Sequence, residues 1–159
     1  MSHSPRDRVI GWILVAIQAG LIGGIVLVPR DAAFDGGASI DWLSWLLIGV
    51  AGLLGVWALR HLGSGLTPLP LPNGSVDLIT SGPYRWMRHP IYTAVMVGMS
   101  GIALRTRSWV PLALAAALVV FLGLKSRWEE RHLEAGFPGY SDYAETTARF
   151  VPIRRPKRD

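Results

Sequence analysis

Two clusters of polar side chains in this sequence have the residue types that binding and catalysis need. The first is the stretch GPYRWMRHPIYT at residues 82–93, which sets two arginines, a histidine and two tyrosines around two prolines, just before an apolar run. Pro90 suits the first turn of a helix, where its missing N–H removes no hydrogen bond. Arg88 and His89 then lie at the helix start, where unpaired backbone N–H groups and the helix dipole favour an anion such as a carboxylate or phosphate.

One face of the same predicted helix continues beyond His89 as a wall of aromatic and thioether side chains. Tyr92, Met96 and Met99 follow at spacings of three, four and three residues, which places them on one face. An anion-attracting end beside such a wall suits a ligand with polar and apolar parts. The alternative is an interfacial belt, in which the arginines reach lipid headgroups and the aromatic rings lie at the membrane boundary.

Glu129 and Glu130 form the second cluster, directly after another apolar run. The sequence at 125–134 contains no helix breaker before Gly136 and Pro138, so we expect the helix to continue through both glutamates. A hairpin of the two helices would return this cluster to the first one. A ligand with both an amino group and a carboxylate would suit the two clusters together. The alternative is a solvated face of ion pairs, which is common on a helix that leaves a membrane.

The elements that must position these clusters are membrane helices. Half of the 159 residues are hydrophobic and seven are tryptophan, more apolar surface than a soluble domain of this size could bury. The apolar runs are Val9–Val28, Trp42–Leu59, Ile91–Leu104 and Trp109–Leu124. The third is short for a hydrocarbon layer of about 30 Å, so it must begin deep or rely on the arginines that follow it. A signal peptide is the alternative for the first run, but that run is unusually long and no A-x-A motif follows it.

The expected fold class is therefore all-α: a polytopic membrane protein with about four transmembrane helices. The last two would form a tight hairpin, and the last would extend into the cytosol. We expect one integral membrane domain over 1–159, with a helix pair at 1–62, a loop, hairpin and cytosolic segment at 63–153, and a basic tail at 154–159. The Gly/Pro-rich loop at 63–83 is long, and loops of that length are usually functional or disordered. The chain has no cysteine, which excludes disulfides, thiolate metal sites and a cysteine nucleophile.

The distribution of positive charge predicts the orientation in the membrane. Of the 16 lysines and arginines, 13 lie in the segments 1–8, 60–90 and 125–159, and 3 lie in the two opposite loops. The positive-inside rule then places both termini and both polar clusters in the cytoplasm. The net charge of +5 thus reflects topology and contact with membrane lipids. No nucleic-acid partner is expected, because the basic residues lie at membrane ends.

These residues resemble a family of membrane enzymes. The block GPYRWMRHPIY, a short apolar helix pair, the stretch EERHLEAGFPGYSDY and a final RFVP are similar to the isoprenylcysteine carboxyl methyltransferase and phospholipid N-methyltransferase superfamily. The resemblance covers roughly residues 60–153, and the combination is more specific than any single piece. Members of this superfamily use S-adenosylmethionine, which is therefore the cofactor that the resemblance implies.

The resemblance also implies a cofactor pocket that faces the cytosol over the hairpin. His89 and Tyr92 match residues that contact the methionine end of the cofactor, and we expect the neighbouring Arg88 to share in binding it. The segment near the adenosine corresponds to Gly82, Pro83 and Tyr84.

The resemblance gives the two glutamates different tasks. One is expected to hold the cofactor's amino group, and the other to order the substrate together with Arg127 or Lys125. The sequence leaves open which is which. The working assignment places Glu129 with the cofactor, and Glu130 with Arg127 at the reaction itself.

The implied reaction is methyl transfer to an amphiphilic acceptor. Transfer from a sulfonium is an in-line displacement that depends on positioning. A carboxylate acceptor needs no base, whereas an amine would use one such as Glu130. The acceptor, whether a prenylated protein, a phospholipid headgroup or a small lipid-like metabolite, would enter from the bilayer between the second and third helices. The phospholipid branch has Gly-x-Gly in its third helix, whereas Gly98 and Gly101 are spaced one residue wider here.

Two other functions remain open. Membrane sterol-type reductases resemble the same C-terminal region and use NADPH, but they need basic residues for its 2′-phosphate, and the glutamate pair favours the methyltransferase. A non-enzymatic helical scaffold would leave the long loop and the paired clusters unexplained. A serine hydrolase or a nucleotide-binding loop lacks its motif. The four histidines, at 3, 61, 89 and 132, are too scattered for a zinc site, so no metal is expected.

Overall fold

The structure, a computed structural model, describes residues 4–28, 33–63 and 78–153, and these residues are almost entirely helical. In chain order the elements are α1 (Pro5–Leu27), α2 (Gly37–Leu62), the short 3₁₀ helix η2 (Gly82–Arg85), α3 (Pro90–Thr106), α4 (Trp109–Gly136) and α5 (Tyr140–Thr146). The single β contact in this part of the chain is a parallel bridge between Met87 and Ala148. The all-α prediction is confirmed. Most of the predicted functional loop and the basic tail lie outside the described residues.

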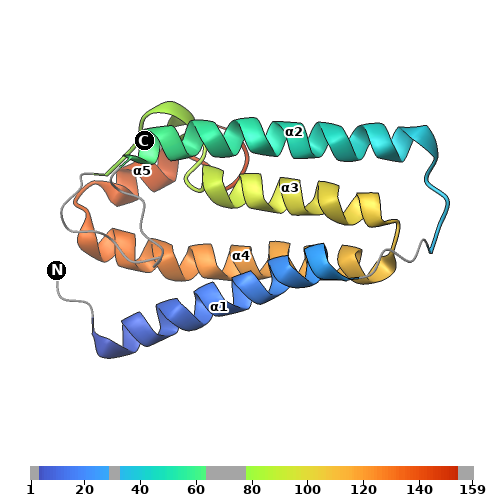
Figure 1. Cartoon of the computed structure of the whole chain (residues 1–159). Coiled ribbons are helices and arrows are strands. Elements are labelled where there is room, and N and C mark those ends of the chain that lie inside the picture. Colours follow the sequence, from blue (N-terminus) through green and yellow to red (C-terminus); the bar gives the residue numbers. More distant parts are fainter. Residues whose placement is uncertain (1–3, 29–32, 64–77, 154–159) are drawn as a thin grey trace.

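The four long helices lie side by side in the order α2, α3, α4 and α1 (Figure 1). The helices α1, α2 and α4 are long and apolar enough to cross a membrane, which makes the chain an integral membrane protein. Helix α3 has 17 residues, or about 25 Å at 1.5 Å per residue, and lies between α2 and α4. A fourth crossing by α3, and the side of the membrane that each end faces, stay predictions.

Helices α3 and α4 form the predicted tight hairpin. Helix α3 ends at Thr106 and α4 begins at Trp109, and Arg107 makes the turn in the left-handed conformation with φ 52°. Helix α3 begins at Pro90, as the sequence predicts, because proline fits the first helical position. Helix α4 continues without a break to Gly136 and carries both glutamates beyond the apolar run.

The core of the bundle lies where α1, α3 and α4 meet. Its buried cluster consists of Ile25, Ala103, Ala115, Leu118 and Leu122. The predicted wall of Tyr92, Met96 and Met99 packs against this cluster. The three side chains therefore do share one face of α3, and that face is turned to the core.

Helices α2 and α3 approach closely because two glycines of α3 face α2. A Cβ added at Gly101 would lie 2.9 Å from the Ser44 carbonyl oxygen, and one at Gly98 would lie 3.1 Å from the Ala51 Cβ. Small residues at a helix interface allow this kind of backbone approach in membranes. The wider glycine spacing noted in the sequence therefore has a packing role.

Substituting Gly101→Ala should destabilise the bundle. The obstacle is a backbone oxygen, so α2 and α3 must move apart, and we expect a loss of about 1–3 kcal/mol. Thermal unfolding in detergent measures this as a lower Tm. The matched control is Gly49→Ala on α2, where a Cβ would meet nothing within 4 Å, so its Tm should be unchanged or slightly raised. Equal Tm values for the two variants would contradict the close approach of α2 and α3.

Candidate functional site

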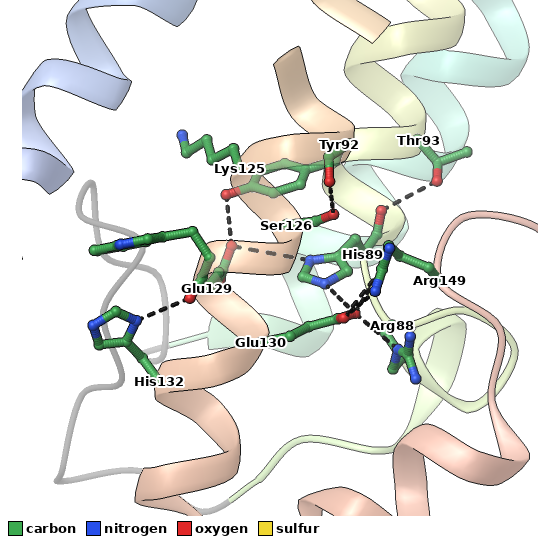
Figure 2. A network of polar contacts seen from close by, with 12 residues as sticks. Arg88, His89, Tyr92, Thr93, Lys125, Ser126, Glu129, Glu130, His132 and Arg149 are labelled. Carbon is green, nitrogen blue, oxygen red and sulfur yellow. Dashed lines mark hydrogen bonds and ion pairs between the residues drawn. The ribbon is translucent and has the colours of Figure 1, made fainter. Parts of the chain in front are cut away.

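The two polar clusters meet at one end of the α3–α4 hairpin, as Figure 2 shows. His89 Nε2 lies 3.1 Å from Glu130 Oε1, and His89 Nδ1 lies 4.0 Å from Glu129 Oε2. The Tyr92 hydroxyl donates to Glu129 Oε2 at 2.7 Å. The expectation that the start of α3 and the polar turns of α4 come together in space is therefore confirmed.

Glu130 is the carboxylate around which the cationic side chains gather. Arg149 donates to both of its oxygens, with Nε 3.0 Å from Oε1 and 3.1 Å from Oε2. Arg88 Nε also lies 3.0 Å from Oε1, but this contact is an ion pair without hydrogen-bond geometry, since that Nε has no hydrogen-bond partner among the described residues. A carboxylate that is only 13% exposed needs such compensation for the water it has lost.

The segment after α5 delivers Arg149 to the site by backbone pairing. The Arg88 N–H donates to the Ala148 carbonyl at 2.9 Å, and the His89 N–H donates to the Arg149 carbonyl at 3.0 Å. These bonds set the chain at 148–149 alongside the start of α3. The guanidinium of Arg149 therefore reaches Glu130, and its hydrogen bonds to Glu130 raise the Arg149 pKa.

His89 is held in one orientation by its neighbours. Its ring is buried and stacks on the Tyr92 ring, with the planes 7° apart and the centroids 5.3 Å apart. The Phe150 ring lies 5.9 Å away. An ionised carboxylate only accepts hydrogen bonds, so the Nε2 that faces Glu130 must carry the proton. Nδ1 is then turned towards Glu129.

The helix η2 holds the predicted adenosine segment beside these residues. Gly82 has φ 58°, a conformation that favours glycine, and a Cβ there would overlap the His61 ring. Pro83 and Tyr84 are buried. Burial raises the pKa of Tyr84 to about 12, with a smaller contribution from the Glu129 carboxylate. Its hydroxyl is therefore protonated at neutral pH and available as a donor.

Arg127 is not part of this cluster. It lies exposed on α4 and makes no hydrogen bond or ion pair with the residues that the structure describes. Glu130, which the working assignment placed with Arg127 at the reaction, is turned inward to Arg88 and Arg149 instead. A catalytic role for Arg127 stays a prediction without a geometric basis.

Sequence reasoning missed Arg149 as a site residue. It noted the block RFVP only as part of a family-like tail, although an arginine beside three apolar residues was a usable signal. Arg149 nevertheless makes the bidentate contact with Glu130.

An apolar groove of about 580 Å³ lies between α2 and α3, next to the polar cluster. Its lining includes Leu54 and Trp57 of α2 and Thr93 of α3. Leu53, also in the lining, is 77% exposed, so the groove is open to the surroundings of the protein. The Thr93 hydroxyl lies 3.1 Å from the His89 carbonyl and 2.9 Å from that of Phe150, which makes Thr93 the boundary between groove and polar cluster.

Most of the chain matches the model of one known protein family. Residues 40–139 match phospholipid methyltransferase. The chain belongs to the phospholipid methyltransferase family. This family is part of the isoprenylcysteine carboxyl methyltransferase-like superfamily of membrane enzymes, so the resemblance noted in the sequence is confirmed. The match supports a membrane methyltransferase.

Proteins similar to this phospholipid methyltransferase family member include two that are named for metal resistance. The cobalt-zinc-cadmium resistance protein CzcN of Cupriavidus metallidurans is 35% identical over 151 residues, which cover 92% of this chain and 64% of CzcN. The nickel-cobalt-cadmium resistance protein NccN of Alcaligenes xylosoxydans is 35% identical over 153 residues, covering 94% of this chain and 69% of NccN. The uncharacterized protein YpbQ of Bacillus subtilis is 33% identical over 97 residues, or 57% of this chain and 58% of YpbQ. The chain thus spans about two thirds of the length of CzcN and NccN.

In the described part of this chain, no group of three or more His, Cys, Asp or Glu side chains could hold a metal ion.

Substituting Glu130→Gln should loosen the C-terminal segment from the start of α3. The change leaves the guanidiniums of Arg88 and Arg149 without a carboxylate. We expect the free energy of unfolding to fall by roughly 2–4 kcal/mol. This is somewhat below the range for fully buried ion pairs because the Arg149 side chain is 29% exposed. Amide hydrogen exchange should become faster at Arg88 and His89, whose N–H groups donate to that segment.

The control for this prediction is Glu134→Gln on the same helix. Glu134 accepts a hydrogen bond from the Ser141 hydroxyl at an exposed position, so its loss should leave exchange at Arg88 and His89 unchanged. Equal exchange rates in the two variants would show that Glu130 does not hold the segment in place.

Proposed function

We propose that this chain is an S-adenosylmethionine-dependent membrane methyltransferase that acts on a lipid-like acceptor. The observation that carries the proposal is the placement of opposite charges around one aromatic stack. Glu129 lies on one side of the His89–Tyr92 pair, and Arg149 approaches with Glu130 on the other. Membership of a methyltransferase family supports the same conclusion.

The donor set fits the charged end of the cofactor. S-adenosylmethionine carries an ammonium, a carboxylate and a sulfonium. Glu129 is the more exposed glutamate, at 22% against 13% for Glu130, and suits the ammonium. The partly exposed guanidinium of Arg149 suits the carboxylate. The sulfonium would lie beside the aromatic cluster of His89, Tyr92 and Phe150.

Glu130 acts in this proposal as an orienting group. Its oxygens already face Arg88, His89 and Arg149, and these partners favour its charged, hydrogen-bonded form over a role in proton uptake. This differs from the working assignment of Glu130 as a base. An acceptor carboxylate would need no base.

The cofactor, when bound, would supply an electrophilic methyl group for an in-line displacement. The residues of the chain do the positioning. Tyr92 and His89 are locked by stacking and by their hydrogen bonds to the glutamates, so the site is organised before anything binds. Buried Tyr84 adds a protonated hydroxyl near Glu129. By the positive-inside rule, this end of the bundle would face the cytoplasm.

The groove between α2 and α3 is the proposed position for the apolar part of the acceptor. It is lined almost entirely by apolar side chains, and it lies between the two helices where the sequence led us to expect lateral access. Thr93 and Met87 bring the groove next to the start of α3. A prenylated protein, a phospholipid or a small lipid-like metabolite would each present a polar group at that boundary.

Calorimetric titration of the detergent-purified protein with S-adenosylhomocysteine tests the cofactor assignment, and a parallel titration uses NADPH. We expect saturable binding of S-adenosylhomocysteine alone. His89→Ala and Glu129→Ala should each weaken it roughly tenfold, since each removes a contact worth about one hydrogen bond to a charged group. The control Glu134→Ala should bind as the wild type does. Binding of NADPH alone would place the chain in the reductase class. Binding of neither compound would leave the non-enzymatic helical scaffold as the remaining function.

Methyl transfer from labelled S-adenosylmethionine tests the acceptor site. The two probes are N-acetyl-S-farnesylcysteine and vesicles that contain phosphatidylethanolamine. Substituting Leu54→Trp fills the groove and should raise the KM for the productive acceptor roughly tenfold, while S-adenosylhomocysteine binding stays unchanged. Leu46→Trp is the control, since Leu46 is exposed on α2 outside the groove lining. An unchanged KM in Leu54→Trp would remove the groove from the proposal.

A further inference from the structure

A lysine is buried where α1, α3 and α4 meet. Lys125 is 4% exposed, and its Nζ donates to Oε1 of Gln18 on α1 at 2.6 Å. The same Nζ lies 5.3 Å from the centroid of the Tyr92 ring, within range of a cation–π interaction. Glu129 follows Lys125 one helical turn later on α4. A buried ammonium is stable only with such partners, so this contact set fixes the side chain in place.

Gln18 is the polar interruption in the long apolar run of α1. A polar amide in a membrane helix is unfavourable unless it finds a hydrogen-bonding partner in the protein. Here that partner is Lys125, 107 residues away in sequence. Helix α1 lies outside residues 40–139, which match the family model. Its Gln18 amide nevertheless lies at the edge of the polar cluster, in contact with Lys125.

We propose that Gln18 and Lys125 are positioning residues for the cofactor site. Gln18 holds the Lys125 ammonium against the face of Tyr92. That contact keeps the Tyr92 ring in the place from which its hydroxyl donates to Glu129 at 2.7 Å and its face stacks on His89. The inference rests on the proposed function, and it makes α1 a part of the site.

The other possibility is that the contact only docks α1 on α4. Docking alone predicts that losing Gln18 changes stability and leaves ligand binding as it was. Positioning predicts that Gln18 affects ligand binding through Lys125. The losses of binding free energy in the Gln18 and Lys125 variants should then not add in the double variant. The order of the contacts, from Gln18 to Lys125 to Tyr92, makes this distinction measurable.

The experiment is a double-mutant cycle with Gln18→Leu, Lys125→Met and the double variant in the full chain. Thermal unfolding without ligand measures the coupling of the two side chains, and titration with S-adenosylhomocysteine measures their effect on the site. We expect each single variant to bind roughly fivefold to tenfold more weakly, and the double variant to bind no more weakly than Lys125→Met alone. Lys125→Arg, which keeps the charge, should recover part of the binding. Ile17→Leu, exposed on α1, is the control and should match the wild type.

Each outcome decides the question. Additive losses of binding, or unchanged binding in Gln18→Leu, would overturn the positioning role even if the unfolding cycle shows coupling. If the unfolding cycle shows no interaction energy between Gln18 and Lys125, their contact does not stabilise the fold. This result would also overturn the positioning role. Coupling in unfolding together with a wild type that binds no S-adenosylhomocysteine would refute the proposed function, and would reduce the Gln18–Lys125 contact to helix docking.

Discussion

The charge of Glu130 is the constraint on which the rest of the site depends. A carboxylate on a membrane hairpin, largely removed from water, is stable only when cations reach it. Arg88 comes from the start of α3 and Arg149 from the segment after α5, and His89 adds a hydrogen bond. Two separate segments are therefore held against α4 around one of its side chains. The orientation of His89, and through it the stack with Tyr92, follows from the same contacts.

Helix α3 connects the polar and apolar halves of the site. The face with Tyr92 is turned to the core and to α4, where the glutamates lie. The glycines of α3 bring α2 within backbone distance, and beside that interface runs the apolar groove. Thr93 stands between the two, bonded to the backbone on the polar side and lining the groove on the other. A short helix can serve both because neighbouring positions point to different sides.

Local rules were enough to predict the hairpin and the meeting of its polar ends. Pro90 marks a helix start by its covalent structure, and the unbroken stretch before Gly136 extends α4, so His89 and Glu130 had to come close. Arg149 could not be placed this way. Its position depends on backbone pairing between segments about 60 residues apart, which leaves no periodic signal in the sequence.

Side-chain direction was the second limit of the sequence. Arg127 lies close to Glu130 along α4, yet it is turned to the exposed face. Gly98 and Gly101 looked like a departure from a family pattern, and only their distance to α2 reveals their packing role. The contact of Gln18 with Lys125 joins residues that no local rule pairs, because it depends on how α1 lies across the hairpin.

The position of Arg149 on a segment separate from the hairpin has a consequence for the order of folding. Arg149 lies 19 residues after Glu130, beyond α5. Until that segment is in place, Arg88 and His89 are the partners of Glu130. The bidentate contact forms only when the chain behind α5 folds back onto the start of α3. The charged pocket is therefore complete only when the C-terminal segment has docked on α3, so the membrane helices can be packed while the site is still open.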